Sequence, residues 1–261
     1  MRYLFSYLSR ASSLIAACLF TLFLAAAEIA HSQDLPAPET LATPVSPKIE
    51  RFAVDSSLVA TSLGDGSLDV NGTFSPFGDI NASGVRVRVS GGDSWYRFIT
   101  NESPRELGSG HTITGGLLAG YQISGERISW IGLIGPTIAE SSDQAVSSTL
   151  WGAKTTLSMY ALPSTQTMAY ASLSYSTIAN AVQFQSKTGL KLVGNFYVGP
   201  EAFFSWRKVL PSYDNVATMR LGGHLSAIKI GGVQFGISAG WAHQEQLGSG
   251  YYGGLNLYWT F

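Results

Sequence analysis

His224 and Ser226 are the side chains best suited to covalent chemistry in this sequence. Residues two positions apart share one face of a β-strand, so their imidazole and hydroxyl groups would lie side by side. A histidine in this arrangement can take the serine proton and turn the hydroxyl into a nucleophile. The nearest acid that could orient the histidine is Glu245, which falls at a predicted strand end. We therefore favour a polar, non-catalytic position for His224 inside the fold, and we predict that the protein is not an enzyme.

Glu201 and Arg220 form the strongest predicted electrostatic pair. If residues 207–213 form a hairpin loop, pairing that is symmetric about this loop places Glu201 opposite Arg220. Opposite charges at facing strand positions attract, and a cationic partner helps to keep a buried carboxylate ionised. Lys191 and Lys154 could extend the pair. The alternative is that all four charges simply fill the interior of the fold.

Alternation of residue types predicts the strands that position these side chains. In Val233–His243 the odd positions are apolar, and polar or small residues lie between them. The same alternation marks Val85–Val89, Trp151–Met159, Leu190–Trp206 and Thr218–Ile228. A strand with arginines on one face and valines on the other suits a wall with lipid outside and a polar lumen inside. We expect the lumen to be lined by Arg86, Arg88, Lys154, Lys191, Glu201, Arg220 and His224, with Tyr197, Phe203, Tyr252 and Tyr258 as inward aromatic residues able to stack on sugar rings.

The last eleven residues, 251–261, alternate most clearly. Every second residue from Tyr251 to Phe261 is apolar or glycine. Such a strand, ending in an aromatic residue, resembles the signal by which outer-membrane barrels are recognised for assembly. We predict an assembly signal made of Tyr251, Leu255, Leu257, Trp259 and Phe261.

Composition also favours a membrane barrel. Charged residues make up only 13% of the chain, against about 25% in soluble domains. Glycine is abundant at 29 residues, aromatic residues reach 12%, and the formal net charge of −1 gives no reason to expect nucleic acid as a partner. The single cysteine, Cys18, lies in a predicted signal peptide, and the four histidines are scattered. We therefore expect no metal and no cofactor.

The chain divides into three predicted segments. Residues 1–32 resemble a cleaved signal peptide, with Arg2 and Arg10 before a short apolar core. Residues 33–48 are rich in proline and predict a disordered periplasmic lead-in. Residues 49–261 predict an all-β, antiparallel, up-and-down transmembrane β-barrel in the bacterial outer membrane. At roughly 9–11 residues per strand plus turns, and with the even strand numbers of bacterial barrels, we expect twelve strands, with ten as the alternative.

Four short motifs, in order, resemble one known family. They are residues 84–88 (GVRVR) followed by Gly91-Gly92, residues 119–122 (AGYQ), residues 197–201 (YVGPE) and the closing residues 253–261. Together they resemble the BcsS family of proteobacterial proteins associated with cellulose biosynthesis, from about residue 50 to the end. The resemblance implies an exported protein that works alongside cellulose synthase, and it brings no catalytic residues with it.

The leading function hypothesis is a non-enzymatic outer-membrane accessory to cellulose biosynthesis and secretion, acting as an anchor or a narrow conduit. Its expected partners are outer-membrane lipid, the barrel-assembly machinery, components of the cellulose synthase complex and the glucan chain. A general small-solute porin is one alternative, and a soluble periplasmic carbohydrate-binding barrel is another. A third is an outer-membrane lipid-modifying esterase that uses His224 and Ser226. Lipid A deacylases carry a comparable His-x-Ser pair, but Ala227 and Ser238 depart from their pattern.

Overall fold

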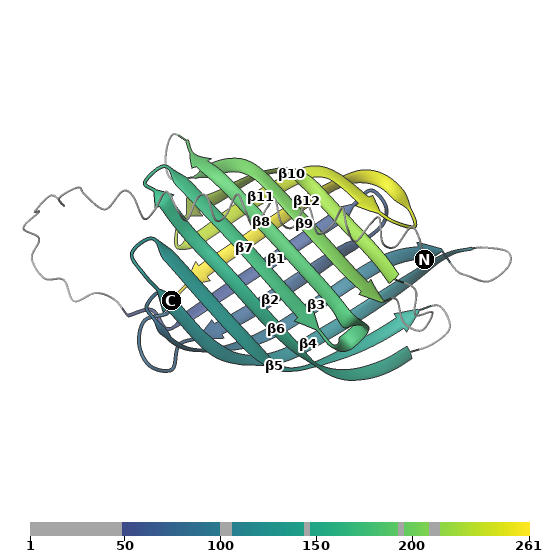
Figure 1. Ribbon diagram of the computed structural model, residues 1–261, viewed down its shortest axis with the longest axis horizontal. Coiled ribbons are helices and arrows are strands. Elements are labelled where there is room, and N and C mark those ends of the chain that lie inside the picture. The colour runs from purple at the N-terminus through teal and green to yellow at the C-terminus, as the bar shows by residue number, and fades with distance from the viewer. Residues whose placement is uncertain (1–48, 100–105, 144–146, 193–195, 209–214) are drawn as a thin grey trace, which may run out of the picture.

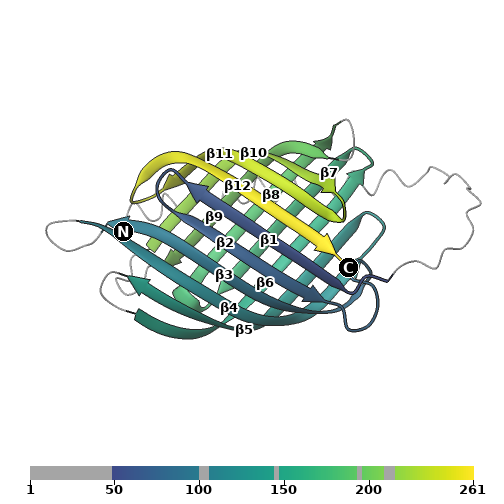
Figure 2. The same ribbon diagram turned by 180° about the vertical axis from the view of Figure 1, so that it is seen from behind.

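The chain forms a closed antiparallel β-barrel of twelve strands (Figures 1 and 2). The computed structural model describes residues 49–99, 106–143, 147–192, 196–208 and 215–261. Each strand pairs with its neighbours in the sequence, and β1 pairs with β12 to close the barrel. The elements are β1 (Phe52–Thr61), β2 (Gly66–Phe74), β3 (Gly84–Ile99), β4 (Leu107–Ser124), β5 (Ile128–Asp143), β6 (Ser147–Ser164), β7 (Thr167–Ser176), the short 3₁₀ turn η1 (Ile178–Asn180), β8 (Ala181–Lys191), β9 (Tyr197–Lys208), β10 (Asn215–Ile230), β11 (Val233–Gln244) and β12 (Gly248–Thr260).

The predicted fold class and its twelve strands are confirmed, and the alternative of ten strands is wrong. The predicted signal peptide, residues 1–32, and the predicted lead-in, residues 33–48, lie outside the described residues. Within the described residues, no helix is long and apolar enough to cross a membrane.

β1 begins and β12 ends at the same end of the barrel, which we call the near end; the opposite end is the far end. At the near end the carbonyl of Phe261 accepts hydrogen bonds from the N–H groups of Arg51 and Phe52, at 3.1 and 3.0 Å. The ring of Phe52 stacks between Phe74 and Phe261, with centroids 4.7 and 5.7 Å away. Phe261 therefore completes the hydrogen bonding between β1 and β12. Closure of the barrel leaves no unpaired sheet edge among the described strands.

The outer surface carries an apolar belt between two rows of aromatic residues. Trp151, Trp241 and Tyr251 lie toward the far end, and Tyr121, Trp130 and Trp259 lie toward the near end; all six are exposed. Between the rows the exposed side chains are aliphatic, among them Leu58, Val70, Val89, Leu117, Ile134, Leu157, Leu173, Leu221, Ile237 and Leu255. On β12, the two rows are eight positions apart, from Tyr251 to Trp259, which is about 20 Å along the axis of a barrel with strands tilted by about 40°. This height suits the apolar band of a membrane barrel, about 25 Å.

Two local predictions need correction. Leu190–Trp206 is not one strand, because β8 ends at Lys191 and β9 begins at Tyr197. The predicted inward and outward phase still holds, since Lys191 pairs with Tyr197 and Leu190 with Val198. The alternation of Thr218–Ile228 breaks at a β-bulge, where the pairing with β11 shifts between Leu225 and Ile228 and Ala227 has a φ of 61°. Through Gly91 and Gly92, β3 keeps one register with both of its neighbours.

Two aromatic residues near strand ends, Tyr96 and Tyr160, lie on the inner face of the barrel. Tyr96 is buried against Val216 and Phe98. Tyr160 pairs with Ser129 and lines the lumen. Both have the strand phase of inward residues, and strand phase, not distance from a strand end, decides which face a side chain occupies.

Candidate functional site

A row of five residues in direct register crosses the inner wall at mid-height. Lys187, Glu201, Gly222, Gly240 and Tyr252 lie opposite one another on β8, β9, β10, β11 and β12. The hydroxyl of Tyr252 donates a hydrogen bond of 2.7 Å to Glu201 Oε1. The ammonium of Lys187 lies 3.2 Å from Glu201 Oε2, and both side chains are nearly buried, at 11% and 8% exposure.

The two glycines explain how one tyrosine spans this distance. A Cβ atom on Gly222 would collide with the hydroxyl of Tyr252, and one on Gly240 would collide with its ring. The phenol ring therefore lies across two strands that carry no side chains at this level. Glu201 gains a charged partner on one side and a neutral donor on the other, which is the kind of pairing that a buried carboxylate requires.

Side chains from the opposite wall complete a layer at this height. Leu118 on β4 and Leu133 on β5 are 1% and 2% exposed, and His224 and Tyr252 are 3% and 5% exposed. In the closed strand order β4 lies opposite β10, and β5 lies opposite β11. We call Leu118, Leu133, Glu201, His224 and Tyr252 the mid-barrel layer. Two cavities lie in the lumen, and none of these residues lines either one. On β10, His224 lies between Arg220, which lines one cavity, and Ser226, which lines the other, so the layer lies between the cavities.

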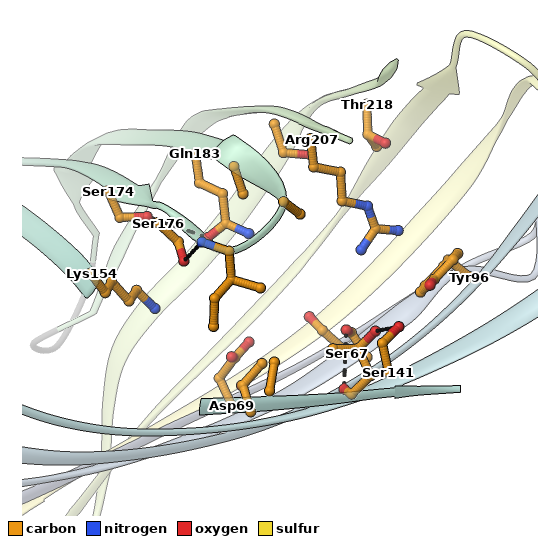
Figure 3. Close-up of a pocket in the computed structure, with 18 of the residues that line it drawn as sticks. Ser67, Asp69, Tyr96, Ser141, Lys154, Ser174, Ser176, Gln183, Arg207 and Thr218 are labelled. Atoms are coloured by element: carbon orange, nitrogen blue, oxygen red, sulfur yellow. Dashed lines mark hydrogen bonds between the residues drawn. The ribbon is translucent and has the colours of Figure 1, made fainter. Parts of the chain in front are cut away.

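The far cavity, of about 260 Å³, lies between this layer and the far end. Figure 3 shows Lys154 and Arg207 extending into it, with Asp69 and Tyr96 on the other side. The guanidinium of Arg207 lies 4.2 Å from the ring centre of Tyr96. Arg220 lies 3.7 Å from the ring centre of Phe203 and 5.6 Å from that of Tyr252. Cations of the chain itself therefore already cover the rings of Tyr96 and Phe203, which line this cavity.

Asp65 stands at the far-end rim of the same cavity, in the turn between β1 and β2. Burial raises the pKa of its carboxyl group. The N–H of Arg97, which donates to it at 3.1 Å, and the charges of Arg207, Arg97 and Arg220 oppose that rise. The rim thus places a carboxylate among several arginines.

The near cavity, of about 660 Å³, lies between the mid-barrel layer and the near end. Asp55 and Arg88 line it, and each is held by a neighbour: Asp55 accepts from Asn71 at 2.7 Å, and Arg88 donates to Thr73 at 2.9 Å. The lining also includes Gln122, Tyr170, Ser226, Gln234, Asn256 and Tyr258.

Arg86, predicted to line the lumen, is fully buried at the near end, where it holds the loop between β2 and β3. Its guanidinium donates to Gln122 Oε1 at 3.1 Å. Its remaining bonds go to the hydroxyl of Ser75 and to the carbonyls of Asp79, Ile80, Ala82 and Val85. Arg86 therefore acts as a clamp on residues 75–83.

In the same loop, the carboxylate of Asp79 accepts hydrogen bonds from the N–H groups of Asn81 and Glu50, at 2.7 and 3.1 Å. These bonds, that of Asn81 above all, lower the pKa of Asp79. The ionised carboxylate thus ties the loop to the chain just before β1.

The predicted ion pair between Glu201 and Arg220 needs correction. Both side chains are inward, but Glu201 lies opposite Gly222, and Arg220 lies opposite Phe203. The reason is the hairpin: β9 continues to Lys208, and β10 begins at Asn215, so the turn is centred later than predicted and the register moves by two residues. Within the described residues, the ion pair of Glu201 is with Lys187.

The other predicted lumen residues are spread along the barrel. Arg88 and Tyr258 line the near cavity, and Lys154, Phe203 and Arg220 line the far cavity. Lys191 and Tyr197 face each other at the near ends of β8 and β9. The predicted assembly-signal residues Tyr251, Leu255, Trp259 and Phe261 are exposed, and Leu257 is partly buried, all on the last strand or directly after it.

His224 and Ser226 share the inner face, as predicted from their spacing, but their contacts differ from those of a catalytic pair. The Nε2 atom of His224 lies 3.0 Å from the carbonyl oxygen of Thr188. The hydroxyl of Ser226 lies at the bulge of β10, buried, with no hydrogen-bond partner among the described residues. Nor do the described residues bring together three His, Cys, Asp or Glu side chains that could hold a metal ion.

Residue types alone do not single out Lys187 or the two glycines of the row. Lys187 has the same inward phase as Gln183 and Gln185 on β8, a strand that was not assigned from the sequence. Its alternation is weak because the outward positions include Ser186 and Thr188. Only pairing with β9 identifies this lysine as the partner of Glu201.

The closed barrel, its apolar belt and its divided polar lumen define a transmembrane β-barrel protein. The sequence model described as "Cellulose biosynthesis protein BcsS" matches residues 63–261, so the chain belongs to that family. No curated protein matches the chain.

Solved barrels are similar to the chain at low sequence identity. The KdgM porin is 7% identical, with a TM-score of 0.42, and the match covers 80% of this chain and 99% of that one. The β-domain of the Bordetella autotransporter BrkA is 12% identical, with a TM-score of 0.46 and coverage of 81% and 99%. The transport unit of the autotransporter AIDA-I from Escherichia coli is 8% identical, with a TM-score of 0.43 and coverage of 85% and 94%.

Proposed function

We propose that this protein is a non-enzymatic outer-membrane accessory of bacterial cellulose biosynthesis and secretion. Membership of the family of cellulose biosynthesis protein BcsS carries this proposal. The apolar belt supports a location in a lipid bilayer, because aliphatic rows on this scale would be costly to expose to water. The near end, which holds both ends of the barrel domain, then faces the periplasm. We further propose that residues 1–32 are removed on export, which mass spectrometry of the purified protein's N-terminus would test.

Within this function we favour an anchoring accessory over an open conduit. The packed mid-barrel layer separates the two cavities, so a glucan chain would have to displace a buried ion pair to pass. The strand bounds also argue against a general porin with a long inward-folded loop: the longest connection, from Phe74 to Gly84, has nine residues. The proposed partners are outer-membrane lipid, the barrel-assembly machinery and periplasmic parts of the cellulose synthase complex.

Deletion of the gene in its own host tests the proposal. We expect less cellulase-releasable glucose outside the cells, and complementation with the wild-type gene should restore it. Unchanged glucose in both the medium and the periplasm would refute a role in cellulose production. Steady conductance of the purified wild-type barrel in planar bilayers would favour a porin instead.

A further inference from the structure

We infer that the near cavity is a binding site for a neutral oligosaccharide, the end of a polysaccharide chain, which enters from the near end. The inference rests on the proposed function only for the choice of a β-glucan as the sugar. The class of ligand follows from the side chains that line the cavity.

The first observation is the placement of aromatic rings. Tyr170 on β7 and Tyr258 on β12 both line the near cavity. In the closed order of twelve strands, β7 and β12 are five places apart, so the two rings come from nearly opposite walls. Unlike Tyr96 and Phe203 in the far cavity, neither ring is covered by a guanidinium group among the described residues. Such phenol rings offer flat apolar surface, with a hydroxyl at the edge, to the faces of a sugar ring.

The second observation is a set of available polar groups. Gln234 and Asn256 lie on adjacent strands and line the cavity. Among the described residues, neither carboxamide has a hydrogen-bond partner. The buried hydroxyl of Ser226, in the same lining, also lacks one within that part of the chain. Buried polar groups are normally satisfied, so this hydroxyl calls for a ligand or a water molecule. Carboxamides and hydroxyls together match the mixed donors and acceptors of a sugar.

The third observation is the balance of charge. Lys187 is paired with Glu201. The remaining charged residues of the lining are Asp55, Glu126, Arg88 and Arg127, two of each sign. The cavity therefore has no excess charge to attract an anionic or a cationic ligand. A charged ligand would meet equal numbers of both signs, so no net attraction would offset the cost of its desolvation.

The fourth observation is the shape of the space. The volume, about 660 Å³, falls within the range of small-molecule sites, about 300–1,000 Å³. Asn81 and the turn 125–127 border the cavity at the near end, and the mid-barrel layer closes it on the other side. A blind cavity of this kind takes the end of a chain and holds it, which suits an anchor for nascent polysaccharide.

Calorimetric titration of the full-length protein in detergent with cellohexaose tests the inference. We expect saturable binding, and we expect Tyr258→Ala and Asn256→Ala each to weaken it about tenfold, the loss of one good contact. Phe203→Ala is the matched control, since it removes an inward aromatic residue on the far side of the layer, and it should leave the affinity unchanged. A heat-dependent shift in gel mobility checks that each variant is folded.

Three results would overturn the inference: no binding of cellohexaose at millimolar concentration, equal binding by folded Tyr258→Ala, or tighter binding of an anionic oligogalacturonate of the same length. None of these results would refute the proposed role in cellulose production, which is tested separately by deletion of the gene. Conversely, if the deletion changes nothing but cellohexaose binds at Tyr258, the site stands and its biological polymer is a different neutral glycan.

Discussion

Neutralising one member of the Lys187–Glu201 ion pair should destabilise the barrel strongly, whereas neutralising both should not. The two charges are 3.2 Å apart and nearly buried. At an effective dielectric constant of about 20, their attraction is about 5 kcal/mol. Desolvation offsets much of this in the native protein, but a single substitution leaves the other charge buried alone, which costs about 3–5 kcal/mol. We therefore expect Glu201→Gln to lower the free energy of unfolding by about 3–5 kcal/mol.

The double variant Lys187→Met/Glu201→Gln should recover most of that loss, because a neutral pair of similar size carries no desolvation penalty. Urea unfolding in lipid vesicles, followed by the fluorescence of the six tryptophans, measures all variants. Lys229→Met is the control, a lysine of β10 near its end, and should change stability by less than about 0.5 kcal/mol. The reasoning fails if Glu201→Gln matches this control, or if the double variant is no more stable than Glu201→Gln.

Four further outcomes are expected. Ala227→Gly should raise the free energy of unfolding by about 1 kcal/mol, because glycine adopts the positive φ of the bulge without strain; an unchanged urea midpoint would contradict this. Ile237→Arg, in the middle of the apolar belt, should cost about 2–4 kcal/mol in vesicles, whereas His243→Arg, on the same face beyond the belt, should cost little. Tyr252→Ala should join the two cavities and raise single-channel conductance above that of the wild type. If neither the variant nor the wild type conducts, other side chains close the lumen. Since the pKa of Asp79 is lowered in the folded state, its stabilising effect should be complete above the unfolded value of 3.8 and lost as the pH falls through the folded value. Asp79→Asn should thus lower the thermal midpoint at pH ~6 but not at pH ~2, and an equal deficit at both would count against it.

The alternation of residue types predicted which side chains face the lumen and which face outward. Alternation put Arg88, Lys154, Glu201 and Arg220 on the inner face and Ile237 on the outer face, and the structure agrees. This works because the pleat of a strand sends successive side chains to opposite faces, whatever the strand pairs with. The number of strands followed from length and the even-number rule, and the closing phenylalanine from the last alternating segment.

Alternation did not predict which residues these side chains contact. A turn centred later than predicted moved the β9–β10 register by two residues, which kept Glu201 inside but exchanged Arg220 for Lys187 as its ion-pair partner. A register shift of two residues keeps each side chain on the same face of the strand but changes the residue that lies opposite it.

The sequence by itself therefore determined the inner and outer faces of the wall, its apolar belt and its family. Only the closed barrel decided that Tyr252 crosses Gly240 and Gly222 to reach Glu201, and that the lumen is divided in two. The physical reason is that alternation is a local property of each strand. Contacts across a lumen depend instead on the lengths of all the turns and on the stagger with which the last strand meets the first.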